Sequence, residues 1–217
     1  MISLHSLDRE EAVRYLGGAG VAMNAEMERL LDVCEAEVLQ AAAPKYLYKI
    51  KELPCPELEQ GDDIRAHLAG CTQAVLLAAT LGAEVDKRIR VAQVTDLSRA
   101  VVLDALASVA VEQVCAQFDA LLAEQCPDRF QTFRFSPGYG DFPIGLQKWF
   151  LTELDAPKKI GLTTNENSLL IPTKSVTAVL GLSETEVPGQ RRGCAVCDLH
   201  ETCTYRKRGP LRILKRF

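Results

Sequence analysis

The run Gln73-Ala-Val-Leu-Leu-Ala-Ala-Thr80 decides the fold of this chain. An apolar run this short, bounded here by Gly70 and Gly82, is typical of a strand that is buried on both faces. Such a strand lies inside a domain, because other elements must cover each of its faces. Further on, Asp96 is expected to cap the longest helical pattern of the chain, which continues to about Gln125. The sequence therefore predicts a sheet packed on helices.

Two helices and a strand are expected before this run. Asp8 should cap a short helix that ends at Leu16, and Asn24 should cap a longer helix that ends before Pro44. In residues 45–51, Tyr46, Tyr48 and Ile50 then alternate with lysines at positions 45, 49 and 51, which is typical of a half-exposed strand.

The same signals predict the remaining elements. Asp62 or Asp63 should cap a helix over residues 62–68, and a strand is expected over 130–135. A helix should run from Pro143 to Leu154, where Pro157 breaks it, and two or three short strands should follow within 160–182. We predict an α+β fold, a curved mixed or antiparallel sheet packed against helices, over residues 1–188. Residues 189–217 would form a separate basic, cysteine-rich tail.

The composition is that of an ordinary soluble globular protein with a buried core. Hydrophobic residues make up 47% of the chain and charged residues 25%, which excludes disorder over most of its length. No apolar run approaches the ~20 residues that cross a membrane. The first ten residues lack the apolar segment of a signal peptide. We therefore expect a cytoplasmic protein with no membrane partner, and its eight cysteines argue against a disulfide framework.

Charge is distributed unevenly. Residues 191–217 hold eight Lys and Arg and two acidic residues, a net charge of +6, although the whole chain has a net charge of −4. A basic tail on an acidic body can contact RNA or an acidic partner, and a solvated tail that balances the body is the simpler interpretation. Aromatic residues are not interleaved with the basic ones in the manner of nucleic-acid-binding segments, which argues against nucleic acid.

The tail also holds the densest group of metal-binding residue types. Cys194, Cys197 and Cys203 have the spacing C-x2-C-x5-C, with His200 among them. Three thiolates and an imidazole suit tetrahedral zinc, whereas three thiolates alone suit an iron–sulfur cluster with an open fourth position. The alternative is a set of reduced cysteines without a metal. His67 has no such neighbours in the sequence and is interpreted as an ordinary polar residue.

The most unusual local segment is Arg134-Phe-Ser-Pro-Gly-Tyr-Gly-Asp-Phe-Pro143, between a predicted strand and a predicted helix. Its two glycines allow tight turns and a close approach of the backbone to a ligand. Arg134 offers a fork for a carboxylate or phosphate, Tyr139 offers a ring face, and the following helix offers free backbone N–H groups. This combination suits a nucleotide that carries an amino acid. The alternative is a simple strand-to-helix connection with Arg134 in a surface ion pair.

Two blocks of the sequence resemble a known family. Arg134-x-x-Pro-Gly-Tyr-x-x-x-Pro143 resembles the Arg-Pro-Ala-Pro-Gly-Tyr-Pro signature of the activation (reactivation) domain of cobalamin-dependent methionine synthase. Ile160-Gly-Leu-Thr-Thr164 and then Ser168-x-x-x-Pro172-x-x-Ser175-Val-Thr177 resemble its Leu-Thr-Glu-Ser-x-x-Met-x-Pro-x-x-Ser-Val-Ser-Gly stretch, in the same order. Arg14-Tyr-Leu-Gly17 and Ala78-Ala-Thr-Leu-Gly82 are similar to features of the free-standing, shorter members. The resemblance implies that fold for residues 1–185.

The resemblance also implies a set of binding residues, because the loop of this family wraps S-adenosylmethionine. The matching residues are Arg134 for the ligand carboxylate and Phe135, Ser136, Gly138 and Tyr139 for its adenine and ribose. A helical glutamate of the family lies near the ligand amino group, and Glu112 is the candidate here. The helical pattern places Glu112 close to the inward stripe, where an unpaired carboxylate would be costly. Gly140-Asp-Phe142 departs from the usual Pro-Ala-Cys of the family.

The function that the resemblance implies is an accessory role in methyl transfer. The chain would bind S-adenosylmethionine and support the reductive remethylation of a cobalamin-dependent methionine synthase or related corrinoid protein. Cobalamin would come only with that partner, because the printed sequence has no Asp-x-His-x-x-Gly motif. A separate electron donor, or an iron–sulfur cluster in the tail, would supply the electron. The alternative is a ligand-binding or redox-sensing protein on the same fold, and whether the chain is itself a methyltransferase component stays open.

Overall fold

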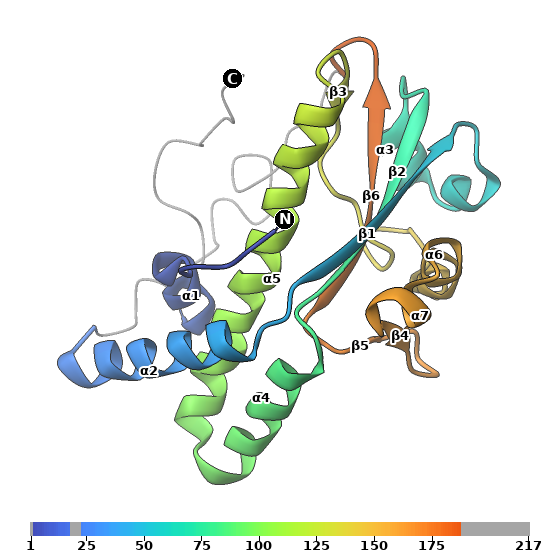
Figure 1. Ribbon diagram of the computed structural model, residues 1–217. Coiled ribbons are helices and arrows are strands. Elements are labelled where there is room, and N and C mark those ends of the chain that lie inside the picture. Colours follow the sequence, from blue (N-terminus) through green and yellow to red (C-terminus); the bar gives the residue numbers. More distant parts are fainter. Residues whose placement is uncertain (1, 18–22, 188–217) are drawn as a thin grey trace.

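The computed structural model describes residues 2–17 and 23–187, and a four-stranded antiparallel sheet lies at its centre (Figure 1). The strands, in their order across the sheet, are β1 (Lys45–Glu52), β2 (Gln73–Thr80), β6 (Ser175–Ser183) and β3 (Phe130–Gln131). β2 pairs along its whole length with β1 on one side and with β6 on the other. The predicted α+β fold is confirmed, with an antiparallel sheet.

Helices cover both faces of this sheet. One face carries α1 (Arg9–Leu16), α2 (Ala25–Ala41), α4 (Ala83–Thr95) and α5 (Leu97–Gln125). The other face carries α3 (Asp62–Leu68), α6 (Gln147–Leu154) and α7 (Ala156–Ile160). Figure 1 shows α5 on one side of the strands and α6 and α7 on the other. Val75 and Leu77 of β2 pack on the first group and Leu76 on the second, all with no exposed surface, so the predicted strand with two buried faces is confirmed.

Short elements complete the described chain. They are the 3-10 helices η2 (Pro56–Glu59) and η3 (Ile144–Leu146) and the paired strands β4 (Thr163–Thr164) and β5 (Leu170–Ile171). Together with β6, these last two strands are the short strands that the sequence predicts within residues 160–182.

Three predicted helix caps are confirmed. The side chains of Asp8, Asn24 and Asp96 accept hydrogen bonds from backbone N–H groups of α1, α2 and α5, at 3.0, 2.9 and 3.1 Å. Each cap satisfies a donor that the first turn of the helix leaves without a partner. For this reason these helices begin where the sequence places their starts.

Helix α3 begins differently from the prediction. Gly61 occupies its cap position, and Asp62 and Asp63 lie inside its first turn. A distant residue supplies the cap: the Asp141 carboxylate accepts hydrogen bonds from the N–H groups of Asp62 and Asp63, at 2.6 and 3.1 Å. Because this cap comes from a loop far along the chain, the local sequence could not reveal it.

The region after β3 departs from the prediction in three ways. The expected strand over 130–135 pairs as a ladder only at Phe130–Gln131 and continues as a single bridge at Phe135. The helix expected from Pro143 begins at Gln147, because η3 precedes it. Pro157 lies in the first turn of α7, where proline is tolerated, and the break falls instead at Asp155, whose φ is 53°.

Helix α5 has the bounds that the sequence predicts, and its length and composition would suffice to cross a membrane. In the structure, 61% of its most apolar window is buried inside the domain. Its apolar side chains pack against α1, α2, α4 and one face of the sheet. Helix α5 is therefore a core helix of this fold, and a buried core helix can be as long and as apolar as a membrane-spanning one.

Candidate functional site

A pocket of about 440 Å³ lies beside the first residues of β6. The ladder of β3 reaches only Leu182 and Ser183, so no strand within the described ranges pairs with β6 at Ser175–Thr177 on this side. The open edge is flanked by α5 on one layer and α6 on the other. The lining residues are Glu112, Phe133, Arg134, Phe135, Ser136, Tyr139, Gln147, Leu170, Ser175, Val176 and Thr177. Its volume lies within the range of small-molecule sites.

The structure brings most of the predicted ligand residues to this pocket. Glu112, Arg134, Phe135, Ser136 and Tyr139 all line it, whereas Gly138 belongs to the same loop without lining the pocket. Both signature blocks contribute, because Ser175 and Thr177 of the second block form part of the wall. The two blocks, which a helix separates in the sequence, thus meet at one place in the fold.

Backbone hydrogen bonds hold the loop of the first block against the sheet. Phe135 and Val179 of β6 exchange two such bonds, with N···O distances of 2.9 and 2.8 Å. Further along, the Gly138 N–H donates to the Phe142 carbonyl at 2.8 Å. Gly138 has a φ of 96°, a conformation that side-chain-bearing residues rarely adopt. Glycine at this position therefore sets the shape of the turn.

A pair of aspartates ties the far end of this loop to α3. The Asp141 carboxylate caps α3, and in return the Asp141 N–H donates to Oδ2 of Asp63 at 3.1 Å. A Cβ placed on Gly140 would come within 1.9 Å of the Asp63 carboxylate, so the close approach requires glycine. This contact, which we call the aspartate clasp, uses two of the residues by which the loop departs from the family signature.

His67 supports the same loop from the other end of α3, and its interpretation as an ordinary polar residue is wrong. It is 5% exposed, and its Nε2 lies 2.8 Å from the Thr132 hydroxyl. Its ring lies 4.5 Å from that of Phe133 and stacks on that of Phe135 at 5.0 Å. Burial lowers the pKa of His67 to about 4, so the ring is neutral at physiological pH. Two pocket side chains thus rest on a buried neutral imidazole.

An ion-pair network forms the charged side of the pocket. The Arg134 guanidinium lies 2.9 Å from the Glu112 carboxylate and 3.4 Å from that of Asp119. The Arg134 side chain is only 11% exposed, whereas that of Glu112 is 51% exposed. The expectation that Glu112 lies close to the inward stripe is therefore wrong, because its carboxylate reaches the pocket from the open side of α5. The ion pair foreseen for Arg134 exists, and it lies in the pocket wall.

Sequence reasoning missed several lining residues. Gln147 begins α6, and neither its neighbours nor its type marks it as a ligand contact. Phe133 was part of a predicted strand, and only its alternation with Phe135 indicated a common face. Ser175 and Thr177 were quoted for their match to the second block, which was the one signal that could have placed them here.

A wider pocket of about 780 Å³ adjoins the first and shares Glu112 and Ser175 with it. Its walls come from α1, α4, α5 and residues 173–175. Lys174 lines it, and its ammonium lies 2.8 Å from the Asp104 carboxylate and 2.9 Å from the Ser108 hydroxyl. The smaller pocket is thus continuous with a broader depression along α5.

The predicted metal ligands Cys194, Cys197, His200 and Cys203 lie outside the described residues. Over residues 2–17 and 23–187, no group of three or more His, Cys, Asp and Glu side chains could hold a metal ion. The metal centre in the tail, and the boundary between residues 188 and 189, stay predictions.

Comparisons with known proteins bear on this geometry. No protein-family model matches the chain, and no curated protein matches its sequence. Among solved structures, a crystal structure of the MetH reactivation domain bound to AdoHcy superposes with a TM-score of 0.63 at 15% identity, over 83% of this chain and 75% of that chain. The chain has the fold of the MetH reactivation domain. The resemblance first seen in two short blocks is thereby confirmed at the level of the fold, and that MetH domain holds AdoHcy.

Proposed function

We propose that this chain binds S-adenosylmethionine in the pocket at the edge of β6 and offers its methyl group to a corrinoid protein. The observation that supports this proposal is the meeting of Glu112, Arg134 and the loop of residues 134–139 around one pocket. The MetH reactivation domain, which shares the fold, was crystallised with AdoHcy, the demethylated form of that ligand.

The charged side of the pocket suits the amino-acid end of the ligand. The amino-acid end is a zwitterion, with a carboxylate and an ammonium group close together. These two charges are complementary to the Arg134 guanidinium and the Glu112 carboxylate, which lie 2.9 Å apart. On binding, the ligand carboxylate would pair with the Arg134 guanidinium and the ligand ammonium group would pair with Glu112. Two ion pairs with the ligand would then replace the one between Arg134 and Glu112. Because Arg134 is held at 11% exposure, its fork is oriented before the ligand arrives.

The rest of the pocket suits the adenosine end. Phe133, Phe135 and Tyr139 line it, and aromatic faces stack on heteroaromatic bases. Phe135 and Tyr139 lie edge to face at 6.2 Å, which leaves the exposed Tyr139 ring free to turn toward a ligand. The backbone of the loop, fixed by its bonds to β6, would contact the ribose.

The role in reactivation follows from the chemistry of the ligand. The bond between the sulfonium sulfur and the methyl carbon breaks, the sulfur keeps the electron pair and becomes a thioether, and the methyl carbon bonds to the reduced cobalt of the partner. That cobalt supplies the electron pair, after a separate reductant has delivered one electron to it. The residues of this chain would orient the sulfonium and neutralise the charges of the amino-acid end. The wider depression that adjoins the pocket leaves room for the partner to approach.

Calorimetric titration with S-adenosylmethionine and S-adenosylhomocysteine tests the proposal. Arg134→Ala removes charge-assisted hydrogen bonds worth about 1.5–3 kcal/mol, so we expect affinity to fall at least about tenfold. Arg134→Lys should recover little, because a point charge cannot reproduce the planar fork. Arg129→Ala is the matched control, because Arg129 pairs with Glu184 away from the pocket. Thermal melts check that each variant folds.

Two results would contradict the proposal. One is a wild-type chain that binds neither ligand at millimolar concentration, and the other is an Arg134→Ala variant that binds as tightly as wild type. Copurification with a corrinoid protein would support the reactivation role. Binding of the ligand with no corrinoid partner would instead favour the ligand-sensing alternative.

A further inference from the structure

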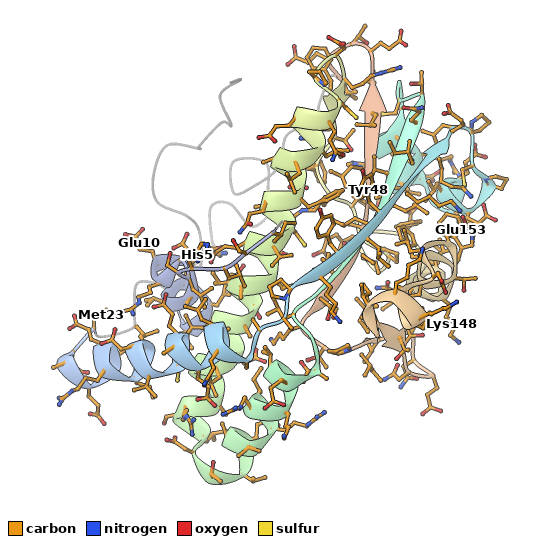
Figure 2. The ribbon with its side chains drawn as sticks, in the orientation of Figure 1. His5, Glu10, Met23, Tyr48, Lys148 and Glu153 are labelled. Atoms are coloured by element: carbon orange, nitrogen blue, oxygen red, sulfur yellow. The ribbon has the colours of Figure 1, made fainter. Side chains whose placement is uncertain are left out.

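Gln147 is a polar side chain that the fold buries in the pocket wall without using it fully. It is the first residue of α6 and is 7% exposed, so more than nine-tenths of it is buried. The next residue, Lys148, is exposed on the outer side of α6 (Figure 2). Gln147 therefore faces the sheet and lines the pocket from the layer of α6, whereas Glu112 reaches it from the layer of α5.

One hydrogen bond fixes the Gln147 amide. The Thr177 hydroxyl donates to its Oε1, and Thr177 is itself 1% exposed and lines the same pocket. Among the residues that the structure describes, the Nε2 group of Gln147 has no hydrogen-bond partner, and Oε1 keeps a second lone pair. If the amide is turned over, Thr177 bonds Nε2 and leaves Oε1. Either way, one polar atom of the amide stays available to a ligand in the pocket that Gln147 lines.

The surroundings of the amide indicate which ligand chemistry it serves. The Thr177 hydroxyl contacts the amide, the rings of Phe133, Phe135 and Tyr139 line the same pocket, and Phe135 packs on the same core cluster as α6. A neutral donor–acceptor pair beside aromatic faces matches the edge of a heteroaromatic base. A glutamine amide pairs in particular with adenine, donating to a ring nitrogen and accepting from the exocyclic amino group. The charged groups, Arg134 and Glu112, lie on the other layer of the pocket.

We propose that Gln147 is the residue that recognises the base of the bound nucleoside and selects adenine, and this inference rests on the proposed function. Thr177 positions the amide, so that one lone pair of Oε1 stays available for the amino group of adenine. The loop of residues 134–139 would hold the remainder of the ligand. The two residues that select the base thus lie on α6 and β6, outside the loop of residues 134–139.

The test compares two ligands, S-adenosylhomocysteine and S-inosylhomocysteine, in which oxygen replaces the amino group of the base. Wild type should bind the adenine form roughly tenfold or more tightly, as one such paired contact provides. In Gln147→Leu, affinity for the adenine form should fall and the ratio should approach one. Gln147→Glu removes the amide donor, so its affinity for the adenine form should also fall. It keeps an oxygen that accepts from the Thr177 hydroxyl, so the contact between α6 and β6 is retained. Gln117→Leu is the control, because Gln117 bonds the backbone of Ser3 at the N-terminal segment and does not line the pocket.

The outcomes separate this inference from the proposed function. If wild type binds neither ligand, the proposed function fails and the inference fails with it. If wild type binds the adenine form while both Gln147 variants keep its affinity and its ratio, Gln147 does not read the base and the proposed function stands. Equal binding of the two ligands by wild type would also overturn the inference.

Discussion

Single residues decide the chemistry of this pocket through their burial. His67, Thr177 and Gln147 are each 7% exposed or less, and each is a polar group that supports or lines the pocket. Glu112 is exposed, and it matters only because it meets Arg134, which follows 22 positions later. No periodicity along the sequence relates these two residues. The burial of polar side chains next to the signature loop is therefore information that only the fold supplies.

The buried His67 predicts a particular dependence of stability on pH. Burial lowers its pKa from 6.5 to about 4, so between these values the unfolded chain binds one more proton than the folded chain. The contribution of His67 to stability is complete above pH 6.5 and is lost as the pH falls toward 4, at up to about 1.4 kcal/mol per pH unit. His67→Phe keeps a ring for stacking and does not titrate. We expect its free energy of unfolding to change less with pH in this window than that of wild type.

Chemical denaturation at several pH values between 4 and 7 measures this difference. The comparison uses the slope against pH, because His67→Phe also loses the contact with Thr132 and its absolute stability will differ. His5→Asn, which removes an exposed histidine, is the comparison variant. Parallel curves for wild type and His67→Phe would show that His67 is not a buried neutral histidine.

At the scale of elements, the sequence predicted the features that depend on neighbouring residues, and it missed those that depend on contacts between distant parts of the chain. The starts of α1, α2 and α5 could be predicted because their capping residues, Asp8, Asn24 and Asp96, directly precede these helices in the sequence. The start of α3 is set by Asp141, and the start of α6 is delayed by η3. The short length of β3 could not be predicted either, because it depends on where the loop leaves β6. That short length is what opens the pocket.

The aspartate clasp predicts that loop geometry and α3 are coupled. Asp141→Ala removes the cap of α3 and the tie to the loop, so stability should fall by about 0.5–2 kcal/mol, as for other lost caps. The backbone amides of Asp62 and Asp63 should exchange faster with solvent, because they lose their acceptor. Affinity for S-adenosylhomocysteine should fall several-fold as the loop loosens.

Asn24→Ala provides the matched comparison, because it removes the cap of α2, far from the pocket in the sequence and on another helix. It should cost similar stability and leave both the exchange of the α3 amides and the affinity unchanged. Unchanged exchange of Asp62 and Asp63 in Asp141→Ala would contradict the clasp itself. Faster exchange with unchanged affinity would show that the clasp serves the helix alone.

At the scale of the whole molecule, the pocket lies where two layers meet at the edge of the sheet. The helices around α5 bury one face of the strands, and those around α6 bury the other. A ligand that contacts Glu112 and Gln147 would join the two layers, and it would stabilise the fold by mass action as its concentration rises above its dissociation constant. The α+β class and the order of elements follow from local patterns, whereas this junction follows from the packing of the layers.

The last prediction concerns the boundary between domain and tail. The last buried apolar side chain of the described core is Leu182, and β6 ends at Ser183. A chain of residues 1–188 thus keeps every described core contact, so we expect it to fold, with a melting temperature within about 2–4 °C of the full chain, and to bind S-adenosylhomocysteine equally well. The metal should be lost with the tail. Full-length protein purified without oxygen should contain either one zinc per chain, or iron and sulfide with a broad visible absorbance.

A triple Cys194→Ser, Cys197→Ser, Cys203→Ser variant should lose that metal as completely as the truncated chain does. Cys126→Ser should retain it, since Cys126 is a free cysteine of the folded domain. Full-length protein without metal, whose three tail thiols titrate freely, would show that the tail cysteines are unliganded. A truncated chain that fails to fold would place the domain boundary later than residue 188. Because folding, ligand affinity and metal content are measured separately, each of the two proposed parts of the chain can fail without the other.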